Sequence, residues 1–123
     1  MRVYQIAEEL AADCWDDAEA LTQHPIAKEI GGQLYAAVLS VASQIAEGYS
    51  RSSGKDRVRF FEYALGSVRE SMNWYRGSRP VLGDESVIDR LDRLEEMRRL
   101  LLAIIPRERG RIISKSESSV PRH

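Results

Sequence analysis

Residues 31–46 read GGQLYAAVLSVASQIA and carry no charged side chain. Apolar residues recur here every three or four positions, which is the period of a helix with one buried stripe. The remaining faces hold only small or neutral side chains, so we expect the helix to be covered on more than one side. Either a neighbouring subunit or a bound partner covers it, or the helix is central to its own monomer. Six residues are candidates for contact between subunits: Gln33, Ala36, Ala37, Ser40, Ser43 and Gln44.

Three further segments share this helical period. They cover about residues 3–21, 54–76 and 86–105, and the helix that contains the uncharged run covers about residues 26–47. Short connections between consecutive helices favour antiparallel neighbours. The sequence therefore predicts an all-α domain over residues 1–106, an up-down-up-down antiparallel four-helix bundle that forms oligomers. Pro106 is expected to stop the last helix, which leaves residues 107–123 as a basic, Ser-rich tail that is frayed or disordered.

Local signals refine the helix ends. Gly48 is placed to end the second helix, because glycine readily adopts the left-handed backbone conformation found at helix C-termini. Ser53, three residues before Asp56, reads as the N-cap of the third helix. Gly66 lies in the middle of that helix, where glycine is unfavourable, so we expect a close helix crossing there.

Composition bounds the class of protein. The chain has 123 residues, enough for one domain with its own core. The single cysteine, Cys14, excludes an internal disulfide and a cysteine-cluster zinc site, and its place in an apolar stripe predicts a core residue. Acidic residues crowd the first twenty positions, which is unlike a secretory signal, and no apolar run is long enough to cross a membrane. We expect a cytoplasmic protein without membrane contact.

The formal net charge of −1 hides an uneven distribution. Residues 1–30 carry a net charge of −5 and residues 80–105 carry −2, whereas residues 51–79 carry +4 and residues 106–123 carry +3. These runs are either ordinary solvated helix faces or one basic side that binds RNA or DNA. The candidates for such a nucleic-acid or anion site are Arg51, Lys55, Arg57, Arg59, Arg69, Arg76, Arg107, Arg109 and Arg111.

Catalytic patterns are missing from the sequence. Neither histidine, His24 or His123, follows a glutamate by three positions, as a ferritin-like di-iron site requires. Phosphate-binding glycine loops and zinc-protease motifs do not occur either. We therefore expect no catalytic residue, no metal, no cofactor and no enzymatic activity.

Two segments carry a family resemblance. Residues 40–51 read SVASQIAEGYSR, and residues 59–70 read RFFEYALGSVRE. Together they resemble the bacterial "four helix bundle protein" family, first met as proteins encoded in intervening sequences of 23S rRNA genes. Gln33-Leu34 also fits the family pattern, whereas Gln44 replaces its asparagine and residues 68–71 depart from its Leu-Glu-x-Glu. The matching residues are Ile45, Ala46, Glu47, Gly48, Tyr49, Arg51, Phe60, Ala64, Gly66, Ser67 and Glu70.

The resemblance implies a homopentamer of four-helix bundles with no established activity. It also implies a relation to the accessory proteins of diversity-generating retroelements, which are pentameric, markedly basic and thought to bind nucleic acid and a reverse transcriptase. The net charge of −1 differs from that basic profile.

The residues at the corner between the second and third helices allow two interpretations, one structural and one functional. In the structural reading, Glu47 accepts a hydrogen bond from Arg51 or from loop amides, and Tyr49 covers the corner next to Gly48. In the functional reading, Arg51, Lys55 and the following helix N-terminus hold a phosphate. We favour the structural reading.

Overall fold

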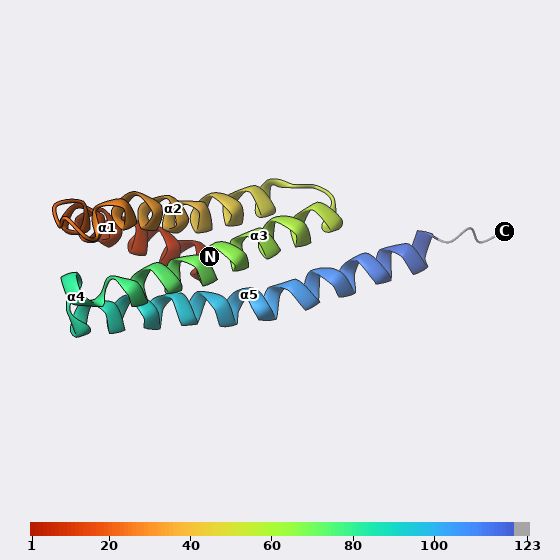
Figure 1. Cartoon of the computed structure of the whole chain (residues 1–123). Coiled ribbons are helices and arrows are strands. Elements are labelled where there is room, and N and C mark those ends of the chain that lie inside the picture. The colour runs from red at the N-terminus through yellow and green to blue at the C-terminus, as the bar shows by residue number, and fades with distance from the viewer. Residues whose placement is uncertain (120–123) are drawn as a thin grey trace.

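The computed structural model describes the backbone of residues 1–119 and the side chains of residues 1–110. Every regular element in this part of the chain is a helix. Figure 1 shows the turns α1–α2 and α3–α4–α5 at one end of the molecule and the α2–α3 connection at the other. The helices are α1 (Arg2–Thr22), α2 (Lys28–Ser50), α3 (Gly54–Gly77), the short α4 (Arg79–Leu82) and α5 (Asp84–Ser119).

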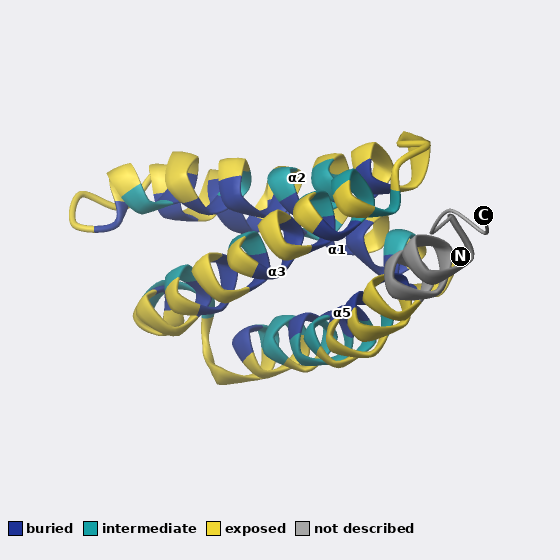
Figure 2. Ribbon diagram, turned by 90° about the vertical axis from the view of Figure 1, so that its right-hand side faces the viewer, coloured by how far each residue is buried: buried dark blue, intermediate teal, exposed yellow. Residues whose placement is uncertain are grey.

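The four long helices enclose one apolar core. α2 packs against α1 and α3, while α5 packs mainly against α3 and more lightly against α1. Figure 2 shows the buried residues turned toward the middle of the bundle and the exposed residues turned outward. Leu34, Val38, Val41 and Ile45 of the uncharged helix are at most 1% exposed, so the stripe expected from the sequence is buried.

A polar network is buried beside this core, where α1, α3 and α5 meet. The Tyr75 hydroxyl donates to Asp17 Oδ2 at 2.7 Å, and Arg90 donates to both carboxylate oxygens at 2.8 and 3.2 Å. Cys14 is fully buried next to it, and burial raises the pKa of its thiol to about 11. Burial also raises the pKa of Tyr75 far above its usual range, so the phenol stays protonated. The prediction that Cys14 is a core residue is confirmed.

Pro106 does not end the last helix, and this expectation is wrong. α5 continues through Pro106 to Ser119, so much of the expected tail is helical. Proline removes one backbone hydrogen bond from the helix. Ion pairs of the residues that follow Pro106 offset this loss. Glu108 accepts from Arg57 Nε at 3.1 Å, and Arg109 pairs with Glu62, so both pairs hold this part of α5 against α3. Residues 120–123 of the predicted tail lie outside the described residues.

Two expectations about glycines are also wrong. Gly48 lies inside α2 and is not left-handed, because Gly83, with a φ of 84°, is the one residue with positive φ among those described. Gly48 instead allows a close approach: a Cβ built there would lie 2.5 Å from Cε1 of Phe61. Gly66 has open space around it rather than a helix crossing. The capping prediction is confirmed, since Ser53 Oγ accepts from the Asp56 amide at 3.4 Å.

The predicted turn before the last helix contains a helical turn of its own. α4 begins with Pro80 in its first turn, a position that proline favours because its missing N–H would have no helical partner. Gly83 then reverses the chain into α5.

Candidate functional site

The corner between α2 and α3 is held by its own side chains. Arg51 Nη2 donates to Glu47 Oε2 at 2.8 Å, and the Arg51 guanidinium lies 4.7 Å from the ring centre of Phe60. The Tyr49 ring packs on Phe61 with a centroid distance of 4.9 Å. Arg51 therefore already has an anionic partner and an aromatic partner, and a phosphate at the corner would compete with Glu47.

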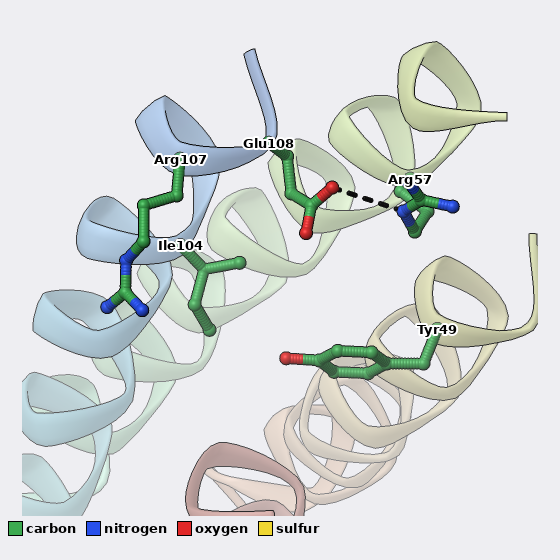
Figure 3. A pocket seen from close by; sticks show the side chains of 5 residues that line it. All are labelled: Tyr49, Arg57, Ile104, Arg107 and Glu108. Carbon is green, nitrogen blue, oxygen red and sulfur yellow. Dashed lines mark hydrogen bonds and ion pairs between the residues drawn. The ribbon is translucent and has the colours of Figure 1, made fainter. Parts of the chain in front are cut away.

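A cavity of about 420 Å³ opens beside this corner (Figure 3). The Tyr49 ring reaches from α2 toward α5 across it, and Arg57 on α3 faces Glu108 on α5. Arg57 makes further bonds, because its Nη1 donates to the carbonyls of Arg51 and Ser52 at 2.9 and 3.1 Å. Burial raises the pKa of Tyr49. The lining residues are Tyr49, Arg57, Ile104, Arg107 and Glu108.

This cavity depends on the part of α5 that follows Pro106, since Arg107 and Glu108 both come from it. Sequence reasoning did not anticipate the part that Glu108 plays, because residues 107–123 were expected to be frayed. The alternating charges of Arg107-Glu108-Arg109 are compatible with a helix that forms ion pairs with α3. This pattern is the sequence feature that could have indicated the role of Glu108.

Four of the nine basic candidates already have carboxylate partners. Arg51, Arg57, Arg59 and Arg109 pair with Glu47, Glu108, Asp56 and Glu62 respectively. Arg76 donates to the Asn73 side-chain oxygen at 3.3 Å. Within residues 1–110, Lys55, Arg69 and Arg107 form no ion pair, and the side chain of Arg111 lies outside the described residues. The chain's own acids thus neutralise part of the apparent basic patch.

Arg69 and Arg76 lie away from the corner, in a second cleft between α3 and α5. This cleft has a volume of about 370 Å³ and also receives Arg98 and Glu95 from α5. Arg98 holds Glu95 through two bonds of 2.8 and 2.7 Å. Arg98 was not among the sequence candidates, because residues 80–105 carry a net negative charge.

Between residues 31 and 46, the outward side of α2 is uncharged and exposed. Gly32, Ala36, Leu39, Ser43 and Ala46 are all exposed and follow one another at helical spacing; we call this stripe the α2 face. Of the six candidates for subunit contact, Gln33, Ala36 and Ser43 are exposed and Gln44 is half-buried. Ala37 is buried inside the subunit, and Ser40 is occupied by a 2.9 Å hydrogen bond to Ser67.

An apolar groove of about 330 Å³ between α1 and α2 continues the α2 face at Gly32. Trp15 is 57% exposed and meets Tyr35 edge to face, with 5.3 Å between ring centres. We call this the Trp15 groove. An exposed tryptophan beside an uncharged helix face is typical of a protein contact surface. The groove is lined by Trp15, Ala18, Glu19, Thr22, Gln23, Gly32 and Tyr35.

In the part of the chain that the structure describes, no three His, Cys, Asp or Glu side chains come together as metal ligands would. The helices described here also lack a stretch long and apolar enough to cross a membrane.

Comparison with known proteins decides the family. The family model for the 23S rRNA-intervening sequence protein matches residues 1–103. The chain belongs to this family. The match covers α1 to α4 and most of α5, and it ends just before Pro106.

A solved structure supports the fold of this family member. It is a protein of unknown function from the S23 ribosomal protein family of Bacteroides thetaiotaomicron, determined at 1.70 Å resolution. The two folds agree with a TM-score of 0.78 over 84% of this chain and 97% of that one, at 19% sequence identity. At that identity the likeness concerns the fold. No curated protein matches the chain.

Proposed function

We propose that this family member is a non-enzymatic, homo-oligomeric scaffold or interaction protein whose subunits join through the α2 face and the Trp15 groove. The subunit is taken as an up-down-up-down antiparallel bundle, which the alternating ends of the connections in Figure 1 support. The observation that carries the proposal is the exposed, uncharged α2 face. The sequence resemblance favours five subunits.

The physical reason is the cost of leaving this surface in water. Leu39 is 42% exposed and Trp15 is 57% exposed, on neighbouring helices. Small side chains at Gly32, Ala36 and Ser43 would let a second helix approach closely, and no charge on the α2 face would have to be desolvated. Aromatic residues in such a position contribute a large share of binding energy.

Light scattering of the purified full chain tests this assembly. We expect a mass that is a multiple of 14.0 kDa for the wild type and a 14.0 kDa monomer for Leu39→Glu. The matched control is Ile88→Glu, because Ile88 is 50% exposed on α5, which packs against α3 and α1 and is not a direct neighbour of α2 in the described part of the chain. A wild type that is monomeric at micromolar concentration would refute the assembly, and native mass spectrometry counts the subunits.

A second candidate function is binding of RNA or DNA by the basic residues. Lys55, Arg69 and Arg107 support it, because they have no carboxylate partner among the described residues. Phosphate backbone contacts weaken steeply with salt. We expect retardation of RNA or DNA at low salt that fades as salt is added, and a weaker effect in Lys55→Gln and Arg107→Gln. If both variants retard RNA or DNA as strongly as the wild type does, these basic residues do not form a nucleic-acid binding surface.

A further inference from the structure

The cleft between α3 and α5 gathers positive charge from two helices. Positions 69, 73 and 76 are spaced by four and three residues, so they lie on one face of α3, and positions 95 and 98 share a face of α5. Because α3 and α5 pack side by side, the two faces meet along one seam (Figure 1). The lining residues are Arg69, Met72, Asn73, Arg76, Glu95 and Arg98.

The charges in this cleft do not balance. Glu95 is the one carboxylate that lines it, and Arg98 already holds Glu95 with both prongs of its guanidinium. Arg99, which does not line the cleft, also has its Nε 3.9 Å from Glu95. The hydrogen bond from Arg98 is the main cause that lowers the pKa of Glu95, so Glu95 carries a full negative charge at neutral pH as an ordinary glutamate does. One negative charge is therefore shared among several arginines.

Two of these arginines form no ion pair among the described residues. Arg69 has no carboxylate partner, and Arg76 donates its hydrogen bond to the neutral Asn73 amide, while its charge acts on Glu95 without direct contact. The nearest acid along α3, Glu70, accepts from Trp74 Nε1 at 3.4 Å. Unlike the paired arginines at the α2–α3 corner, Arg69 and Arg76 can receive an external anion without breaking an ion pair.

We infer that this cleft binds a compact polyphosphate group, meaning two or more linked phosphates on a small ligand. The guanidinium forks of Arg69 and Arg76 on α3 can each donate parallel hydrogen bonds to phosphate oxygens. Arg98 on α5 can add a contact through Nη1, because its bonds to Glu95 use only Nε and Nη2. A volume of about 370 Å³ is in the range of small-ligand sites. The site requires neither the α2 face nor the Trp15 groove, so it goes beyond the proposed assembly.

Isothermal titration of the full chain with inorganic triphosphate at low salt tests the site. We expect saturable binding, weakened about tenfold by Arg69→Gln and by Arg98→Gln, since each removes one charge-assisted contact. Glu95→Gln should tighten binding about fivefold, because it removes the one negative charge in the cleft. The control is Lys55→Gln, which removes the same charge at the α2–α3 corner and should leave the affinity within about twofold of wild type.

The outcomes separate this site from the functions proposed above. Absence of triphosphate binding, or equal weakening by Lys55→Gln and Arg69→Gln, would overturn the site. Binding of an RNA oligonucleotide through Arg69 and Arg98 without triphosphate binding would also overturn it, in favour of a nucleic-acid backbone. Light scattering of each variant reports the assembly independently, and circular dichroism confirms that each remains helical.

Discussion

Replacing Gly48 by alanine should destabilise the bundle, although the same change usually favours a helix. The added Cβ would lie 2.5 Å from Cε1 and 2.8 Å from Cδ1 of Phe61. Ordinary contacts between such carbons are about 3.5 to 4.0 Å, so roughly 1 Å of movement is needed. Phe61 is fully buried and has the Tyr49 ring packed on it, so its ring cannot simply swing away.

The expected magnitude follows from two opposing terms. Overpacking of a core costs about 1 to 3 kcal/mol, whereas alanine gains about 1 kcal/mol over glycine in a helix interior. Gly66→Ala is the matched control, because it receives the same helix gain with open space around its Cβ. The free energies of unfolding of the two variants should therefore differ by about 1 to 3 kcal/mol, with Gly48→Ala the less stable.

Urea and thermal unfolding at one fixed protein concentration measure this difference. For a chain of this size, about 1 kcal/mol shifts the melting temperature by roughly 4 °C, so we expect a gap of about 4 to 12 °C between the variants. A double-mutant cycle with Phe61→Leu isolates the contact, because the smaller side chain should remove part of the penalty at Gly48. If Gly48→Ala is as stable as Gly66→Ala, the close approach to Phe61 does not constrain α2.

Three further predictions concern the buried network and the end of α5. Asp17→Ala should lower the free energy of unfolding by about 2 to 4 kcal/mol, since the Tyr75 hydroxyl loses its acceptor and Arg90 keeps only its pair with the more exposed Asp89, and a denaturation curve like that of wild type would contradict this. Burial raises the pKa of Cys14 from 9.0 to about 11, so the contribution of the protonated thiol to the free energy of unfolding should be fully present below pH 9 and be lost as the pH rises through 11. The thiol should react with Ellman's reagent only after unfolding, and rapid labelling of the native protein would exclude burial. Pro106→Ala should stabilise the last turns of α5 by up to about 3 kcal/mol, seen as slower amide exchange near Glu108, whereas unchanged exchange would mean that the ion pairs with α3 alone hold this segment.

The sequence was informative wherever one helix could be considered alone. The stripe through Leu34 and Val41, the core position of Cys14 and the cap at Ser53 all follow from local spacing and residue type. The prediction that Pro106 ends the last helix was wrong although the local cost of proline in a helix is real. Glu108 pairs with Arg57 on α3, and local sequence rules do not include such a contact between helices. The prediction of a left-handed Gly48 was wrong for the same reason, since the residue that requires glycine there, Phe61, belongs to α3.

The candidate sites were less accessible to sequence reasoning. Arg51, Arg57 and Arg59 form a basic run in the sequence, but side chains from three different segments neutralise them. Arg98 lies in a stretch with net negative charge, yet α3 brings Arg69 and Arg76 beside it. Net charge along a chain does not report which charges become neighbours in space.

By itself, the sequence determined an all-helical domain, the buried stripe of each long helix and a run of the second helix, residues 31–46, without any charge. Only the tertiary structure decided which sides of that helix stay exposed, where α5 ends and which arginines keep a free charge. The physical reason is that periodicity and capping act within a few residues along the backbone. Exposure and ion pairing depend on the side chains that other helices contribute.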